Sequence, residues 1–103
     1  MSAAPMTGAP TTGTVTDNPA QGRYELVVDG ATAFAAYRIR DGELVFTHTE
    51  VPESLSGRGV GSTLARGALD AARARGLPVV AQCAFIAGYI RKHPEYQDLL
   101  AGG

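Results

Sequence analysis

Three alternate glycines stand where an extended segment is expected to turn into a helix. They are Gly57, Gly59 and Gly61, in the run Leu55-Ser56-Gly57-Arg58-Gly59-Val60-Gly61-Ser62-Thr63-Leu64. The first backbone N–H groups of a helix have no partner inside it and lie at the positive end of its dipole, so they can bind an anion. Glycines leave that approach free of side chains. The run therefore predicts a phosphate-binding surface at the start of a helix.

Two nucleotide-binding loops do not fit this run. A phosphate-loop NTPase needs a Lys directly after its last glycine, but the residues after Gly61 are Ser and Thr. A dinucleotide-binding loop of the form G-x-G-x-x-G has Ser62 in place of its third glycine if it begins at Gly57. If it begins two residues later, it has Leu64 there. The phosphate is therefore expected to belong to another class of ligand.

The residues before the glycine run are typical of strands. Two Asp-Gly pairs, which are strong signals for tight hairpin turns, separate three runs rich in strand-forming residues, 24–28, 31–40 and 43–51. We therefore expect a three-stranded antiparallel meander before any helix.

The residues after the glycine run are expected to form a helix, a strand and a second helix. Apolar residues at helical spacing predict a helix from Val60 to a glycine stop at Gly76. Residues 77–85 are almost wholly apolar, which is typical of a strand covered on both faces and often parallel to its neighbour. Residues 86–92 predict a short helix, and 95–100 a final packed turn.

Composition bounds the classes of partner. The chain has 103 residues, nine Lys and Arg, ten Asp and Glu, and a formal net charge of −1, so nothing attracts nucleic acid or an anionic membrane nonspecifically. No apolar run is long enough for a membrane span. Residues 1–18 lack an apolar period and are expected to be a disordered leader, with a single domain over 19–103.

The cysteine and histidine content bounds the metal and redox chemistry. Cys83 is the only cysteine, so no disulfide can form within the chain, and two histidines do not supply a zinc-ligand cluster. We therefore expect no metal and a reducing, cytoplasmic setting.

Alternate glycines at a helix start after a hairpin sheet resemble the pyrophosphate loop of the GNAT superfamily of acetyl-coenzyme A transferases. That motif is Gln or Arg, two residues, Gly, one residue, then Gly or Ala. The match here runs from Ser56 to Gly61: both glycines fit and Ser56 departs from the motif. The blocks 48–53, 83–85 and 89–96 are similar, in order and spacing, to a small GNAT-like subfamily.

The resemblance implies an α/β (α+β) fold with a splayed central sheet, and acetyl-coenzyme A (acetyl-CoA) as co-substrate. It implies transfer of the acetyl group to an amine acceptor, a small molecule or a protein lysine. Backbone groups from Thr49 to Val51 would hold the pantetheine arm. The pyrophosphate would be held by the loop residues Gly57, Arg58, Gly59, Val60, Gly61 and Ser62, with Arg58 adding a charge.

The candidate general base is Glu50. Together with His48 it is expected on the strand face that carries Leu44 and Phe46. An apolar environment makes a carboxylate more basic, which favours Glu50 as the base. The alternatives are His48 as the base, or an ordinary exposed glutamate at the edge of the sheet.

Two further side chains are candidates for the chemistry. Cys83 is either a nucleophile that takes the acetyl group as a thioester, helped by the helix expected just after it, or a small core residue on the strand face of Val79 and Phe85. Tyr89 corresponds to a tyrosine that larger GNAT enzymes often use to protonate the departing thiolate. It is equally ordinary as a packed residue of a short helix.

Three functions of different classes are therefore weighed. The first is an N-acetyltransferase. The second is a coenzyme A-binding or regulatory module with little turnover, because the chain lacks the N-terminal elements that frame the acceptor pocket in larger GNAT enzymes. The third is a small structural partner protein, which would bind no coenzyme. We prefer the enzyme, with an acceptor pocket that is open or completed by a partner subunit.

Overall fold

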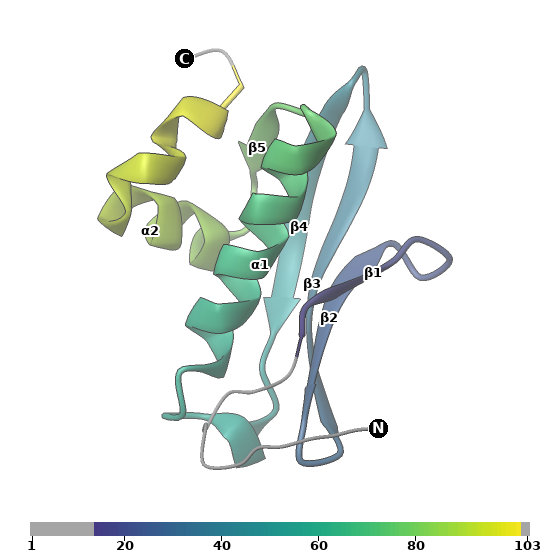
Figure 1. Cartoon of the computed structure of the whole chain (residues 1–103), viewed down its shortest axis with the longest axis vertical. Coiled ribbons are helices and arrows are strands. Elements are labelled where there is room, and N and C mark those ends of the chain that lie inside the picture. The colour runs from purple at the N-terminus through teal and green to yellow at the C-terminus, as the bar shows by residue number, and fades with distance from the viewer. Residues whose placement is uncertain (1–13, 102–103) are drawn as a thin grey trace.

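Five strands lie side by side in one sheet, in the order β1-β2-β3-β4-β5, and the helices gather on one face of it (Figure 1). The computed structural model describes residues 14–101. Its elements are β1 (Thr16–Asn18), β2 (Arg23–Val28), β3 (Ala31–Arg40), β4 (Glu43–Glu50), the 3₁₀ helix η1 (Glu53–Leu55), α1 (Val60–Arg75), β5 (Val79–Ala81), α2 (Ala84–Lys92) and the 3₁₀ helix η2 (Pro94–Leu99).

The predicted meander is confirmed. Strands β2, β3 and β4 pair antiparallel in chain order. In the first turn Asp29 and Gly30 have φ of 52° and 79°, and in the second Asp41 and Gly42 have 54° and 77°. Positive φ at both central residues is what a type I′ turn requires, and its twist matches that of the strands it joins.

The core lies between the sheet and α1, α2 and η2. Alternate residues of β2 and β3 face it, and α1 adds the stripe predicted from its helical spacing. The buried residues of α1 are Val60, Leu64, Ala65, Ala68, Leu69 and Ala72. Small residues on α1 allow the helix to lie close to the sheet. Helix α1 ends at Gly76, where φ is 68° and the N–H group bonds back to Ala72 and Arg73.

Strand β1 corrects the predicted boundary of the leader. Thr16–Asn18 pairs antiparallel with β2, so the ordered sheet begins inside residues 1–18. Asp17 accepts hydrogen bonds from the Tyr37 hydroxyl on β3 and the Arg75 guanidinium at the end of α1. These contacts join β1 to the sheet and to the helix layer. The strand was not predicted because its residues, Thr, Asp and Asn, have no apolar pattern. Residues 1–13 of the expected leader lie outside the described residues.

The strand expected over residues 77–85 is shorter than predicted. Strand β5 is Val79–Ala81 and pairs parallel with β4, as expected. The N–H groups of Gln82 and Cys83 then both bond to the Phe46 carbonyl, at 3.0 and 3.1 Å, and the chain turns into α2 two residues before the predicted helix start. A continuous apolar run fits either a buried strand or a buried helix, so periodicity could not locate this turn.

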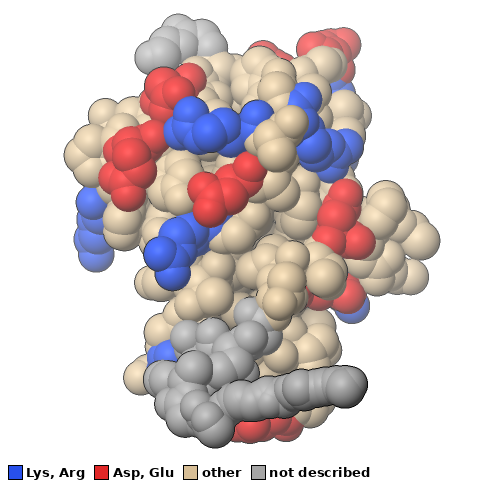
Figure 2. Space-filling model, viewed as in Figure 1, with Lys and Arg blue, Asp and Glu red and all other residues tan. Residues whose placement is uncertain are grey.

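Charged side chains of both signs are interleaved over the upper half of the face shown in Figure 2. Two ion pairs join arginines of α1 to other elements: Arg73 pairs with Asp98 and Arg75 with Asp17, at 2.9 and 3.4 Å. They fasten η2 and β1 to the C-terminal half of α1.

Candidate active site

Strands β4 and β5 part beyond Phe46. Their pairing covers residues 44–46 and 79–81 only, after which residues 47–50 continue β4 and the other chain enters α2. We call this place the splay; it is bounded by residues 47–50 on one side and Cys83 on the other. A strand whose neighbour departs has backbone N–H and C=O groups left to bind something else.

A β-bulge in β4 decides which groups face the splay. Tyr37 pairs with Phe46 and Ala36 pairs with His48, so Thr47 is an extra residue. Before the bulge, Leu44 and Phe46 point their backbone groups toward β5 and their side chains into the core. After one extra residue, the odd-numbered residues instead direct their backbone groups toward the β5 side and their side chains toward the core. Thr49 therefore directs its backbone to the splay and its side chain to the helix side.

Thr49 and Cys83 meet across the splay. The Thr49 hydroxyl oxygen lies 3.1 Å from the Cys83 sulfur, and either atom can donate the hydrogen. Cys83 is 8 % exposed and is the N-cap residue of α2, not a strand residue on the face of Val79 and Phe85 as expected. The Cys83 thiol thus lies directly at the N-terminal end of α2.

The glycine run is the start of α1, as predicted. Gly57 and Gly59 have φ of 78° and 75°, a conformation that other residues rarely adopt, and a Cβ on either would meet open space. The first helical hydrogen bond runs from the Thr63 N–H to the Gly59 carbonyl, at 3.1 Å. The N–H groups of the three residues between them therefore have no partner inside the helix. Those residues are Val60, Gly61 and Ser62.

These groups fit a pyrophosphate. Three outward N–H groups at a helix start can bind phosphate oxygens, and the open space at Gly57 and Gly59 leaves room for them. The buried Val60 side chain, 1 % exposed, anchors the loop to the core. A cavity of about 270 Å³ adjoins this helix start, with Ser62 on one side and the basic Arg91 and Lys92 of α2 on the other.

Gly61 has a different surrounding from the other two glycines. A Cβ at Gly61 would lie 2.7 Å from Cζ of Phe85, which is a residue of α2. Glycine is needed here because an aromatic ring comes close to the backbone. The expectation that Gly61 only opens the approach for phosphate was incomplete.

Two loop residues have polar partners nearby. Arg58 forms an ion pair of 2.8 Å with Asp29 in the hairpin between β2 and β3, which ties the loop to the sheet. The Ser56 side chain, which departs from the family motif, is exposed, and its N–H group bonds to the Glu53 carbonyl.

Glu50 is not on the apolar face where it was expected. The bulge turns His48 and Glu50 to the sheet face opposite the helices, with side chains 59 % and 61 % exposed. The His48 Nε2 atom lies 3.0 Å from a Glu50 carboxylate oxygen. Sequence reasoning named both residues but missed their partnership, because the bulge that gives them a common face left no signal in residues 43–51.

Tyr89 lies away from Cys83, six residues further along α2, which is about 9 Å of helix. Its ring stacks on His93 with 3.9 Å between centroids, and it lines the same cavity as Ser62. Burial raises the pKa of the Tyr89 phenol, and the nearby Arg66 partly offsets this rise. The phenol therefore stays protonated at neutral pH.

Residues 23–99 match the family model of the GCN5-related N-acetyl-transferases. The chain belongs to this family. A similar solved structure is the NMR solution structure of a GCN5-like protein from Staphylococcus aureus. It has a TM-score of 0.67 and 29% identity, and the match covers 86% of this chain and 88% of that one. No curated protein matches the chain. Membership supports acetyl transfer as the general chemistry, and acetyl-CoA is the acetyl donor that the family implies.

In this GCN5-related chain, the glycine loop and the splay lie at the same end of α1. The first turns of α1 and α2 touch through Gly61 and Phe85, and Cys83 directly precedes α2. Within residues 14–101, no group of three or more His, Cys, Asp and Glu side chains could hold a metal ion. No helix of that part of the chain is long and apolar enough to cross a membrane.

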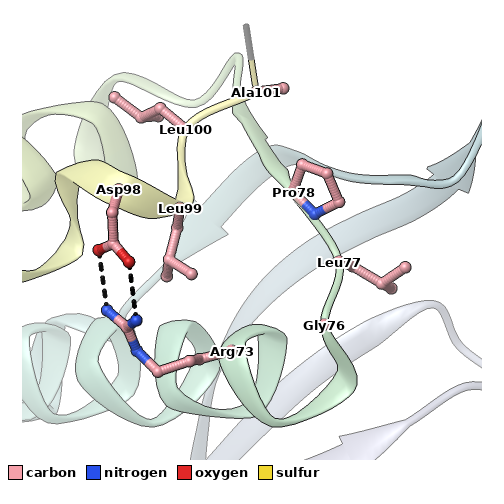
Figure 3. A pocket seen from close by; sticks show the side chains of 8 residues that line it. All are labelled: Arg73, Gly76, Leu77, Pro78, Asp98, Leu99, Leu100 and Ala101. Atoms are coloured by element: carbon pink, nitrogen blue, oxygen red, sulfur yellow. Dashed lines mark hydrogen bonds and ion pairs between the residues drawn. The ribbon is translucent and has the colours of Figure 1, made fainter. Parts of the chain in front are cut away.

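A larger cavity, of about 420 Å³, lies at the other end of α1 (Figure 3). The Arg73 guanidinium reaches across it and bonds to both carboxylate oxygens of Asp98, and also to the Glu95 carbonyl. Apolar residues such as Leu77 and Leu99 form its walls. It lies about 24 Å from the glycine loop along the 16-residue helix, so it is separate from the candidate active site.

Proposed function

We propose that this protein is an acetyl-CoA-dependent N-acetyltransferase that moves an acetyl group to an amine, on a small molecule or on a protein lysine. The observation that carries the proposal is the juxtaposition of free N–H groups at the start of α1 with the splay at Thr49 and Cys83. The start of α1 can bind an anion, and the splay exposes strand backbone beside the Cys83 sulfur. A ligand with a pyrophosphate at one end and a thioester at the other suits both.

The binding roles follow from the loop and the splay. The N–H groups of Val60, Gly61 and Ser62 hold the pyrophosphate, in the open space beside Gly57 and Gly59, and Arg58 adds positive charge near them. The backbone of Thr49 and Val51, the odd residues after the bulge, holds the pantetheine arm as a neighbouring strand would. The thioester carbonyl then lies beside Cys83 and the first N–H groups of α2, which stabilise developing negative charge on its oxygen.

Direct transfer to the amine uses His48 and Glu50, which lie on the sheet face opposite the helices. The neutral amine attacks the carbonyl carbon, the carbon–sulfur bond breaks, and coenzyme A leaves as a thiolate. The proton lost by the amine passes to Glu50, directly or through water, and His48 is hydrogen-bonded to that carboxylate. The thiolate receives a proton from solvent, or from Tyr89 through bridging water, since Tyr89 lies about 9 Å of helix from Cys83.

A covalent route uses Cys83. Its thiolate attacks the same carbonyl carbon, the carbon–sulfur bond to coenzyme A breaks, and the acetyl group remains on Cys83 as a thioester. The proton of Cys83 passes to the departing coenzyme A thiolate. The amine then takes the acetyl group from Cys83, and the thiol is restored. The position of Cys83 at the start of α2 and its contact with Thr49 support this route.

Intact mass after mixing with acetyl-CoA tests function and route together. The covalent route predicts one added acetyl group that hydroxylamine removes and that is absent in Cys83→Ala. Direct transfer predicts no adduct but release of free thiol with an amine acceptor such as a polyamine, a free amino acid or a lysine peptide, and Cys83→Ala keeps it.

Binding of coenzyme A without an adduct or acceptor-dependent thiol release would instead favour a coenzyme-binding or regulatory module. A dissociation constant for acetyl-CoA above about 1 mM in calorimetry would contradict both the enzyme and the coenzyme-binding module, and would favour a structural partner protein. The reducing, cytoplasmic setting expected from a single free cysteine stays a prediction.

A further inference from the structure

Phe85 and Gly61 join the first turns of two helices. Gly61 is the second residue of α1 and Phe85 is the second residue of α2. A Cβ at Gly61 would lie 2.7 Å from Cζ of the ring and 3.4 and 3.5 Å from its two ε carbons. Because Cβ contacts under 3.0 Å essentially never occur in proteins, the ring can hold this position only against a glycine, and any larger residue would make it shift. The two helix starts are thus in direct contact.

Burial alone does not explain this ring. Phe85 is 42 % exposed and is one of three large apolar side chains with such exposure among residues 14–101. The residues of α2 that bury their side chains in the core are Ile86 and Ile90. The tip of the Phe85 ring is instead directed onto the α1 backbone, and its remainder lines the cavity beside Ser62.

The contact connects the two ends of the proposed ligand site. The N–H group of Gly61 belongs to the proposed pyrophosphate site, and Phe85 follows Cys83 by two residues. A coenzyme has a fixed covalent length between pyrophosphate and thioester. That length limits how far apart the two ends can bind, and helix starts held at a matching spacing lower the cost of ordering the arm between them.

We infer that Phe85 is a positioning residue that sets the spacing between the start of α1 and Cys83. The chain thereby selects thiols and thioesters that carry a pyrophosphate at the correct distance over shorter ones that do not. The inference rests on the proposed function, since it assigns the substrate selectivity of that same site. It predicts that the effect of Phe85 depends on residue 61 and on the pyrophosphate end of the ligand.

The test is a double-mutant cycle read by equilibrium binding of two probes, coenzyme A and pantetheine, which has the same thiol arm without the pyrophosphate. Gly61→Ala adds a methyl group that displaces the tip of the Phe85 ring from the start of α1. We expect the affinity for coenzyme A to fall at least about tenfold and that for pantetheine to change less than about twofold, because only coenzyme A must bind at both helix starts and so loses the benefit of their preset spacing.

Phe85→Leu shortens the side chain and supplies the matched rescue. In the wild-type background it loosens the contact and weakens coenzyme A binding. In the Gly61→Ala background it makes room for the methyl group and strengthens binding by at least about fivefold, a reversal that independent sites do not show. Val27→Ala, another exposed apolar position on the sheet, is the control and should change neither affinity.

Additive effects of the two substitutions, or an equal loss of pantetheine affinity, would overturn the inference. If the methyl group of Gly61→Ala instead weakens binding by blocking the phosphate directly, Phe85→Leu will not restore coenzyme A affinity in that background. If Gly61→Ala does not fold, the series Phe, Leu, Ala at residue 85 replaces it, with coenzyme A affinity falling in that order and pantetheine affinity constant. Wild-type protein that binds neither probe would refute the proposed function; binding of coenzyme A with an additive cycle would refute the positioning role alone.

Discussion

Gly67→Ala is expected to destabilise the protein although it replaces a glycine inside a helix. Gly67 lies in the middle of α1, and a Cβ there would clash with Cγ2 of Val15 and lie 2.6 Å from its Cβ. Val15 directly precedes β1 and is half-buried. The segment before β1 therefore packs against the backbone of α1 at this one glycine.

The magnitude is the difference of two effects. Alanine in place of glycine in a helix interior stabilises by about 1 kcal/mol. Inserting a methyl group into an already filled contact costs about 1 to 3 kcal/mol. We therefore expect Gly67→Ala to lower the free energy of unfolding by about 1 kcal/mol. In a Val15→Gly background the three clashing carbons are gone, so the same substitution should raise it by about 1 kcal/mol.

Equilibrium urea unfolding of the four proteins measures both numbers. In a domain of this size, 1 kcal/mol corresponds to about 4 to 8 °C in melting temperature, so thermal unfolding is an independent check. The decisive result is the change of sign between backgrounds. If Gly67→Ala stabilises the protein equally with valine and with glycine at residue 15, the segment before β1 does not pack on α1 and the reasoning is wrong.

Three further substitutions test other contacts. Thr49→Val keeps the shape of the side chain but removes the hydroxyl that lies 3.1 Å from the Cys83 sulfur. Acetyl transfer, followed by mass over time, should slow about three- to tenfold. Equal rates would show that this contact does not affect the reaction. Arg73 lowers the pKa of the Asp98 carboxyl, so this pair stabilises the fold above the ordinary Asp pKa of about 3.9 and loses that effect as pH falls through the lowered value. The melting-temperature difference between wild type and Asp98→Asn should therefore be constant above about pH 5 and vanish in acid; a difference independent of pH would contradict this. Leu64→Ala, at a fully buried position, should cost about 2 to 5 kcal/mol in urea unfolding, and a loss below about 1 kcal/mol would place Leu64 outside the core.

Features set by local chemistry were predictable from the sequence. The Asp-Gly turns require positive φ at both central residues, which few other pairs supply, and this located β2, β3 and β4 to within one residue. The stripe from Val60 and the stop at Gly76 located α1 for the same kind of reason.

Features set by distant contacts were not predictable. Glycines in this chain serve two different purposes: Gly57 and Gly59 provide positive φ, whereas Gly61 and Gly67 allow another side chain to approach closely. A sequence does not distinguish these purposes, because the approaching residues are Phe85 and Val15, far away along the chain. The sequence therefore predicted that the glycines begin α1, but it did not predict which distant side chains each glycine touches.

The bulge at Thr47 explains how one strand serves both an apolar core and a titratable pair. In a strand that alternated throughout, His48 and Glu50 would point into the core beside Phe46, and burying a carboxylate there without a matched partner costs several kcal/mol. The extra residue instead turns both side chains to solvent and brings Thr49 to Cys83. Because side-chain face and backbone direction change together, the same step presents the Thr49 backbone to the splay. The proposed proton acceptor and the proposed thioester site thus lie on opposite faces of one strand, so the amine and the coenzyme would approach from opposite sides of the sheet.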